Sequence, residues 1–238
     1  MTPSWAMLWQ LQRQQLQSAL DAIVVWADMW GMAFNIKKCK VMHLGRSNVK
    51  HEYTMSGEKL ASTTEERDVG VAVLADLKPS AQCTKAARTA AAVLGQISRA
   101  FHYQDRDVFL RLYKQYIMPH LDFSSAAWSP WSIGDIETLE KIQKQAVAMI
   151  SGLRGRTYKE RLKELGMVTL QERRHQTDML QVFKILHGIH KVSATQWFSH
   201  NLGEERLTRR AADPLNLARG RCRLDLRRNF FSQRIVEN

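Results

Sequence analysis

Apolar residues recur at helical spacing near the start of the chain, at Leu16, Leu20, Ile23 and Ala27. This spacing predicts one amphipathic helix over about 10–30. Trp26 and Trp30 lie four residues apart, so both indoles share one face of that helix. Gly31 follows at the position where a left-handed residue commonly ends a helix. Because its apolar face is wide, this helix needs another element, or another part of a longer chain, to pack on.

Short alternating apolar runs come next, and such runs are typical of strands. Four candidates lie at 40–44, 53–55, 59–60 and 68–74. Ser56-Gly57, between the second and the third, is a typical hairpin turn. Together these segments predict a small antiparallel β unit against which the first helix can lie.

The rest of the chain has a helical pattern. Pro79 suits the first turn of a helix, and a stripe of small and apolar residues follows at Cys83, Ala87, Ala90, Leu94, Ile97 and Phe101. Asp105 can cap a second helix, which we expect to end before Pro119. Its predicted apolar face is Val108, Phe109, Leu112, Tyr113 and Tyr116. A third helix starts after Gly134 and stops near Gly152, and three antiparallel helices with modest loops predict a bundle.

Two capping boxes follow the bundle, Thr157-x-x-Glu160 and Thr169-x-x-Glu172. In a capping box the two side chains satisfy each other's free backbone N–H groups at the start of a helix. The boxes predict a short helix ending near Gly166 and a longer one reaching about His190. The longer helix is expected to bury Met179, Val182, Phe183, Leu186 and Ile189.

These elements predict a mainly α fold with a small antiparallel β unit near the N-terminus. We expect four segments. They are 1–77 with the β unit, 78–152 with the bundle, 153–205 with further helices, and an arginine-rich tail at 206–238 that holds nine arginines and two aspartates.

The 238 residues carry a formal net charge of +12, with a pI of about 9.9. Such an excess favours polyanionic partners, although a solvated basic face without a partner has the same composition. The three cysteines are far apart and lack C-x-x-C spacing, which argues against a zinc site or a disulfide framework. No secretory leader is visible, and the longest apolar run, 22–27, is too short to cross a bilayer. We therefore expect a nuclear or cytoplasmic protein that is not secreted and has no membrane partner.

The sequence shows no complete active site. Asp105 and Asp107 are the nearest pair of carboxylates, but their place at a helix start indicates capping and not metal binding. Asp28 lies within the first helix without a second aspartate beside it. His187 and His190 are three residues apart on a helix but lack a third ligand. We therefore expect no metal and no cofactor in this chain.

Basic residues gather in three groups. The first basic group is Lys37, Lys38 and Lys40. The second is Arg154, Arg156 and Lys159, with Arg161 and Lys163 nearby. The third is Arg221, Arg223, Arg227 and Arg228, which Arg209, Arg210 and Arg219 precede and Phe230 and Phe231 follow. Guanidinium groups bind phosphates, and neighbouring aromatic rings stack on exposed bases. The groups predict nucleic-acid binding. The open alternative is a solvated tail that Phe230 and Phe231 only anchor.

Several stretches, in the right order, resemble the C-terminal part of a reverse transcriptase from non-LTR retrotransposons of the LINE type, jockey-like elements among them. They are WADMWGMAFNIKKCKVMHLG, YTMSGEKL with ERDVGV, LYKQYIMPHLDFSSAAWSPW with LEKIQKQAVAMISGL, YKERLKELGMVTLQERR, and NFFSQRIVEN. The resemblance covers nearly the whole chain. It implies the edge of a polymerase palm over 1–77 and a thumb-like helical bundle over 78–152.

The resemblance also implies roles for single residues. Asn35 and Lys38 match the Asn-x-x-Lys motif that follows the catalytic turn, and Lys38 would assist the pyrophosphate leaving group as a residual general acid. The hairpin Met55–Leu60, with Gly57 at its turn, and the strand Asp68-Val69-Gly70 would place the primer 3′ end. The thumb helices would hold the template–primer duplex by its phosphates.

The chain also departs from the family. The catalytic aspartates, which bind Mg²⁺ in the full-length enzymes, belong before the first helix, where this chain has MTPSWAMLWQLQRQ. We therefore expect a truncated RNA-directed DNA polymerase of a transposable element that is inactive alone and still binds RNA or DNA template–primer. The alternative is a non-catalytic interaction protein, or one that self-associates through its first helix.

Overall fold

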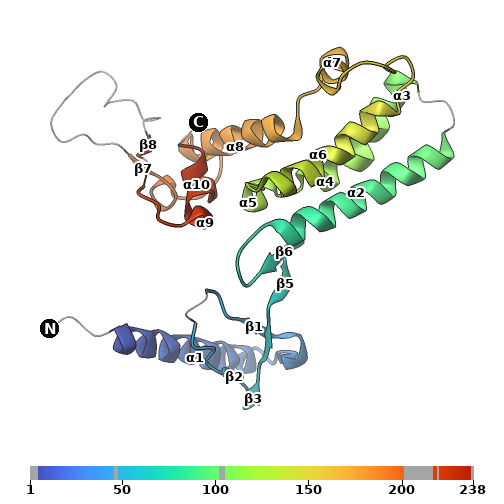
Figure 1. Cartoon of the computed structure of the whole chain (residues 1–238). Helices are drawn as coiled ribbons and strands as arrows, with labels where there is room; N and C mark the ends of the chain where they lie inside the picture. Colours follow the sequence, from blue (N-terminus) through green and yellow to red (C-terminus); the bar gives the residue numbers. More distant parts are fainter. Residues whose placement is uncertain (1–4, 46–47, 102–104, 201–216, 219, 237–238) are drawn as a thin grey trace, which may run out of the picture. The chain divides into compact units, whose positions relative to one another are not determined.

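The computed structural model describes residues 5–45, 48–101, 105–200, 217–218 and 220–236. The fold is mainly helical with a few short strands, which confirms the expected class (Figure 1). The chain divides into two compact units, Met1–Leu77 and Lys78–Asn238. The division lies where the hydrophobic pattern changes from short alternating runs to helical stripes. The finer division of the second unit at residues 152 and 205 stays a prediction.

The first unit, unit 1, begins with the helix α1 (Trp5–Met29). Gly31 ends it with a φ of +65°, as expected. The backbone N–H of Met32 then donates a hydrogen bond to the carbonyl of Ala27 over 2.9 Å. This bond is typical of helices that end at a residue with left-handed backbone angles.

The strands of unit 1 form three separate pairs. Hairpins join β2 (Thr54–Met55) to β3 (Glu58–Lys59) and β5 (Glu65–Asp68) to β6 (Val71–Leu74), whereas β1 (Lys40–Met42) pairs in parallel with β4 (Ala61–Thr63). The prediction of one antiparallel unit is therefore wrong. The hairpin β2–β3 lies between β1 and β4 along the chain. After this hairpin the chain comes back beside β1, and β4 runs in the same direction as β1.

The predicted strand 68–74 is interrupted by a turn. Val69 and Gly70 have φ angles of 42° and 89°, which place them at the tip of the β5–β6 hairpin and outside both strands. A two-residue hairpin turn needs positive φ at both positions, and glycine meets that need without steric cost. The strand β5 was not expected, because its sequence EERD has no apolar alternation.

The core of unit 1 is small. Tyr53, Met55 and Leu60 are buried, and Leu20 and Val24 of α1 pack on them. The Gln17 side chain accepts a hydrogen bond from the backbone N–H of Thr54 over 3.1 Å and donates one to the Thr54 carbonyl over 2.9 Å. Both backbone groups of Thr54 on β2 therefore have hydrogen-bond partners. Because α1 is covered along this stripe only, the expected core positions Leu16 and Ile23 are exposed.

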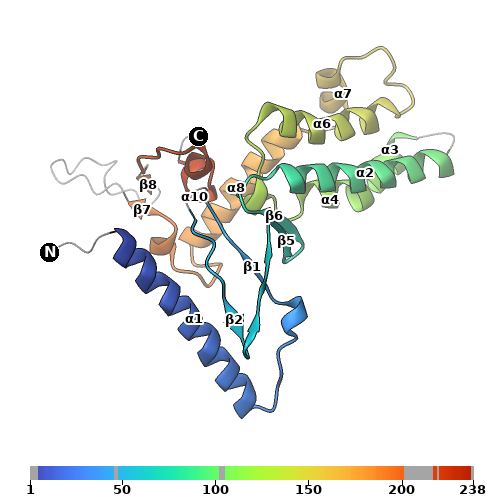
Figure 2. The same cartoon turned by 60° about the horizontal axis from the view of Figure 1, so that its bottom comes forward.

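In the second unit, unit 2, the helices α2, α4 and α6 lie side by side (Figures 1 and 2). Small residues such as Ala90 let α2 approach its neighbours closely. Cys83 is fully buried there, and burial raises the pKa of its thiol to about 12.

The helices and strands of unit 2 follow one another along the chain. They are α2 (Ser80–Ala100), α3 (Arg106–Leu112), the π-helical turn η2 (Tyr113–Ile117), α4 (Met118–Asp122), α5 (Ser125–Trp128), α6 (Ile133–Ala148), α7 (Tyr158–Glu164), α8 (Leu170–Leu186), η3 (Ala194–Gln196), β7 (Ser199–His200), β8 (Leu217–Ala218), α9 (Asp225–Arg228) and α10 (Phe231–Arg234).

Pro119 does not follow a helix end, as the sequence predicted, but lies inside the helical run from α3 to α4. Proline removes one backbone donor and clashes with the carbonyl four residues before it. The π-helical turn η2 lies just ahead, and such wide turns accommodate this interruption. Of the predicted apolar face, Phe109 and Tyr113 are buried, whereas Val108 and Tyr116 are exposed. The buried face continues beyond the prediction through Ile117 and Leu121.

A polar network at the centre of unit 2 joins α7 and α8 to α6. Tyr113 donates to Oε1 of Gln143 over 2.6 Å, and Gln143 donates to the Tyr158 hydroxyl over 3.0 Å and to the Val168 carbonyl over 2.8 Å. The hydroxyl of Tyr158 donates to Glu140. Burial raises the pKa of both tyrosines above the ordinary value, and the bond to Glu140 adds to the rise for Tyr158. Both hydroxyls therefore stay protonated donors.

The two predicted capping boxes are confirmed at the starts of α7 and α8. The predicted buried face of α8 is wrong in part, because Met179, Phe183 and Ile189 are exposed. Instead α8 turns Arg174, Asp178, Val182 and Ile185 inward. The last two pack with Phe198, Phe231 and Ile235, which form the hydrophobic cluster under the C-terminal segment.

Arg234 fixes this C-terminal segment to α8. Its Nε and Nη2 donate to the two oxygens of Asp178 over 2.8 and 2.9 Å, and Nη2 also donates to the Ala126 carbonyl over 2.8 Å. The Arg234 and Asp178 side chains are only 15% and 7% exposed. Residues 225–236 are therefore folded onto the unit.

We predict that Arg234→Leu lowers the free energy of unfolding of unit 2 by about 3–5 kcal/mol, because it leaves the buried Asp178 carboxylate without its cation. Urea unfolding followed by circular dichroism measures the change. The matched control is Arg228→Leu, whose partner Asp225 is 77% exposed. Solvent screening limits that loss to about 0.5 kcal/mol. Equal stabilities of the two variants would contradict the prediction.

Candidate functional site

The first basic group lies in unit 1, just after α1. Lys37 and Lys38 are exposed on the one-turn helix η1 (Ile36–Lys38), which Asn35 precedes. Lys40 lies on β1, and its ammonium group is 2.7 Å from Glu66. That hydrogen bond from Lys40 lowers the pKa of the Glu66 carboxyl group. Lys37 and Lys38 thus keep their charges available to an anion, whereas the charge of Lys40 is partly compensated.

The two glycines that the resemblance singled out lie at hairpin tips. Gly57 has a φ of +78° in the β2–β3 turn, with Ser56 before it at 50°, so the predicted turn is confirmed. Gly70 has a φ of +89° in the β5–β6 turn, so of the expected strand Asp68-Val69-Gly70 only Asp68 lies in a strand. No atom lies within 4 Å of a Cβ built on Gly57, so its conformation and not close packing demands glycine.

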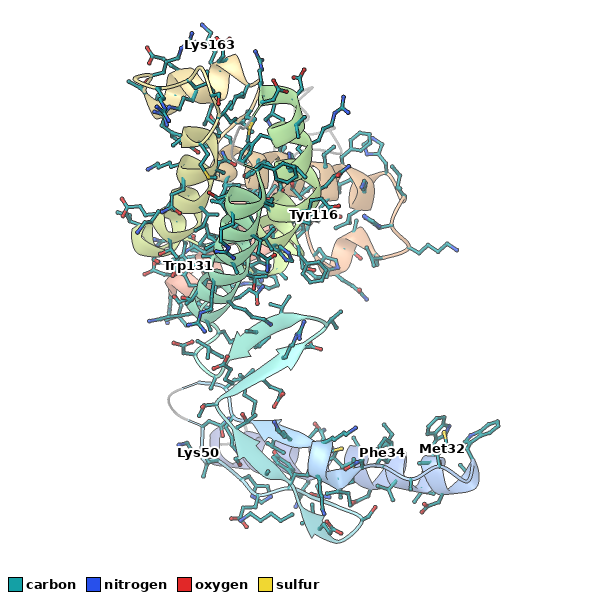
Figure 3. All side chains as sticks on the ribbon, turned by 90° about the vertical axis from the view of Figure 1, so that its right-hand side faces the viewer. Met32, Phe34, Lys50, Tyr116, Trp131 and Lys163 are labelled. Carbon is teal, nitrogen blue, oxygen red and sulfur yellow. The ribbon has the colours of Figure 1, made fainter. Side chains whose placement is uncertain are left out.

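The second basic group lies between α6 and α7 in unit 2. Arg154 is exposed in the connecting loop, and Lys159 is exposed on the first turn of α7. Arg156 donates to Glu164 over 2.9 Å. Lys163, labelled in Figure 3, extends the group along the same short helix. Because Glu164 takes up the charge of Arg156, Arg154 and the lysines carry the net positive charge of this group.

The third basic group lies on the C-terminal segment of unit 2. Arg221 and Arg223 are exposed just before α9, and Arg228 on α9 pairs with Asp225 over 3.2 Å. The guanidinium carbon of Arg227 lies 5.3 Å from the centre of the Phe230 ring. The arginines Arg209, Arg210 and Arg219, also predicted for this group, lie outside the described residues.

An aromatic residue that was missed from the sequence joins this third group. Trp197 follows η3, and its ring lies parallel to that of Phe230, with 6.3 Å between centroids and 1° between planes. Phe231, which was named beside Phe230, is buried in the hydrophobic cluster instead. Trp197 is 33 positions from Phe230, so only the fold brings the two rings together.

The predicted basic side chains differ in whether each one already forms an ion pair with an acidic side chain. Among the residues that the structure describes, no carboxylate lies within 4.0 Å of seven predicted cations. These are Lys37, Lys38, Arg154, Lys159, Arg221, Arg223 and Arg227. The second and third groups lie apart within unit 2, near α7 and near α9 (Figures 1 and 2). The structure therefore offers separate anion-binding surfaces and not one continuous patch.

No magnesium-binding arrangement is present in the described part of the chain. It holds no cluster of three or more His, Cys, Asp or Glu side chains suited to a metal ion. Asp105 accepts hydrogen bonds from the N–H groups of Asp107 and Val108, which confirms its predicted role as a cap. His187 stacks on Phe183, and His190 bonds Gln181. These residues do not fit the Mg²⁺ of the full-length family, and we derive no step through it.

A cavity of about 620 Å³ lies in unit 2 beside His175, Arg174 and Trp131; Trp131 is labelled in Figure 3. Arg174 is buried, and burial lowers the pKa of its guanidinium group. Its Nη2 donates to the Leu121 carbonyl over 3.0 Å, whereas its Nε is buried without a hydrogen-bond partner. No sequence signal marked this arginine, because its position on α8 resembles that of any surface arginine.

Comparison of this chain with models of protein families, with curated proteins and with solved structures finds no match. Within the described residues, every helix is too short or too polar to cross a membrane.

Proposed function

We propose that this chain derives from an RNA-directed DNA polymerase, the reverse transcriptase of a LINE-type retrotransposon. In this proposal the chain has no polymerase activity by itself and binds RNA or DNA template–primer through its basic residues. The observation that carries the proposal is the order of the matching stretches, from WADMWGMAFNIKKCKVMHLG near the start to NFFSQRIVEN near the end.

Local structure supports the proposal at two places. The stretch that resembles a primer-gripping hairpin, YTMSGEKL, is a hairpin with its turn at Ser56 and Gly57. The stretch LYKQYIMPHLDFSSAAW, which resembles part of the thumb, is helical through η2, α4 and α5. In the proposal unit 1 derives from the edge of a palm and the bundle of unit 2 from a thumb.

In the proposal Lys38 contributes charge and not proton transfer. A general acid must first be placed against its leaving group. The described residues hold no cluster of three or more His, Cys, Asp or Glu side chains that could hold a metal-bound nucleotide beside Lys38. Lys38 is then an exposed cation at the end of η1 that can contact a phosphate group.

We predict that the purified chain extends no primer on an RNA template in the presence of Mg²⁺ or Mn²⁺. A gel assay with a labelled primer measures the product. An active reverse transcriptase added to the same mixture is the control, and it must extend the primer to show that the chain does not inhibit the assay. Product above background that persists through a second purification would contradict the proposal.

We also predict binding that falls steeply with salt. About five phosphate contacts give a slope near −4.5 in a plot of log K against log salt concentration for a duplex. Arg221→Gln with Arg223→Gln should reduce that slope by about 2, whatever the base sequence. Lys50→Gln with Lys191→Gln removes the same charge from exposed positions outside the three groups and outside the thumb-like bundle, and should leave the slope unchanged.

Fluorescence anisotropy over a range of salt concentrations measures these slopes. A slope near zero, or no binding at low salt, would refute the binding half of the proposal. A loss of slope of the same size in the Lys50 and Lys191 variant would show that the binding does not depend on the third basic group.

The exposed apolar surface of unit 1 favours a second candidate function, self-association or docking of a partner protein. Met29 and Trp30 are 73% and 69% exposed, and Met32 and Phe34 project from the surface beyond the end of α1 (Figure 3). Further exposed apolar side chains are Leu16, Ile23, Val25 and Trp26. Contiguous apolar surface of this kind is typical of interaction sites.

Self-association predicts a molar mass that rises with protein concentration in multi-angle light scattering. Met29→Gln with Trp30→Gln should restore the monomer mass, because it removes two highly exposed apolar side chains at the C-terminal end of α1. Val69→Gln is the control, since Val69 is 85% exposed at a hairpin tip away from α1. A constant monomer mass for the unchanged chain at every concentration would count against self-association.

A further inference from the structure

Trp197 and Phe230 form an exposed pair of parallel aromatic rings on the C-terminal segment of unit 2. Their planes differ by 1°, and their centroids are 6.3 Å apart. The Trp197 ring rests on the hydrophobic cluster, because it meets the Phe231 ring edge-on at 6.1 Å. Trp197 is thus held from below by Phe231, which the cluster buries.

Their immediate neighbours in sequence point inward. Phe198 and Phe231 are 4% and 8% exposed, whereas Trp197 and Phe230 are 39% and 44% exposed. The cluster is therefore complete without the outer pair, whose parallel rings remain in contact with solvent. Aromatic rings carry a large apolar area, and leaving two of them parallel and half exposed provides a flat surface for another ring.

The surroundings of this pair are positively charged. The guanidinium group of Arg227 lies over the Phe230 ring, and no carboxylate of the described residues lies within 4.0 Å of it. Asp225 is the one acidic residue within 220–236, and Arg228 already binds it. The backbone N–H of Gly220 donates to Oε1 of Gln233 over 3.1 Å, which holds the segment of Arg221 and Arg223 against α10.

We propose that Trp197, Phe230 and Arg227 form a stacking site for unpaired bases, with Arg221 and Arg223 as contacts for the adjoining phosphates. The ligand class is single-stranded nucleic acid, because a duplex hides its base faces and a stacking site needs them free. An acidic peptide would satisfy the arginines but offers no series of flat rings. This inference rests on the proposed nucleic-acid binding and specifies which form of nucleic acid the third basic group recognises.

The test compares three fluorescent probes on the full chain at one low salt concentration. They are oligothymidylate of about 16 nucleotides, enough for a single-strand site, an abasic strand of equal length, and a duplex of equal length. We expect oligothymidylate to bind about tenfold more tightly than the abasic strand, because a stacked base adds affinity that phosphates alone do not.

Variants then locate the stacking. Trp197→Ala and Phe230→Ala should each weaken oligothymidylate binding about tenfold and leave binding of the abasic strand and the duplex within twofold. Phe230→Tyr, which keeps an aromatic face, should restore most of the affinity for oligothymidylate. Phe183→Ala is the matched control, since Phe183 is an aromatic residue 49% exposed on α8 and stacked on His187. It should bind all three probes as the unchanged chain does.

The outcomes separate this inference from the proposed function. No binding of any probe would overturn both. Equal affinity for oligothymidylate and the abasic strand would overturn the stacking site and leave phosphate binding in place. A loss of all three probes in Trp197→Ala, with circular dichroism unchanged, would also overturn it, because the residue would then support the surface and not stack on bases.

Discussion

The buried ion pair of Arg234 with Asp178 determines how the second half of unit 2 is built. A carboxylate and a guanidinium group are costly to remove from water, and excellent geometry must offset that cost. Here the pair is bidentate, and the Ala126 and Asn229 carbonyls take up further guanidinium donors. Since Asp178 must face this partner, α8 turns the same side inward along its length. Val182 and Ile185 then meet the C-terminal segment, and Phe183 is left outside.

Unit 1 is organised by a weaker constraint. Its strands are two to four residues long and form isolated pairs, which are marginal structures unless another element covers them. The stripe of α1 at Leu20 and Val24 supplies that cover, and the side chain of Gln17 satisfies the backbone beside it. One stripe of a 25-residue helix is enough to order the hairpin β2–β3, but from residue 14 on, where side-chain burial is described, it leaves most of the apolar side chains of α1 exposed.

Features set by neighbouring residues were predictable from the sequence. The capping boxes, the cap at Asp105 and the turn at Ser56-Gly57 each depend on a few residues whose hydrogen bonds or φ angles are local. Features set by distant partners were not. The parallel pairing of β1 with β4 depends on the path of the hairpin between them. The buried faces of η2 and α8 depend on a π-helical turn and on Arg234. Among the candidate site residues, local sequence marked Phe230, whereas Trp197 required the fold.

The network that links Tyr113, Gln143, Tyr158 and Glu140 has a consequence for how this chain can diverge. Gln143 accepts from one tyrosine and donates to the other and to the Val168 carbonyl, so each of its polar atoms depends on a different element. An apolar residue at 143 would leave the buried Tyr113 hydroxyl without its acceptor and the Val168 carbonyl without this donor, whereas the Tyr158 hydroxyl would keep its bond to Glu140. Removing Gln143 and its buried partner Tyr113 together leaves fewer unpaired groups than removing Gln143 alone. A change at 143 on α6 is therefore expected to be tolerated better when position 113 changes with it.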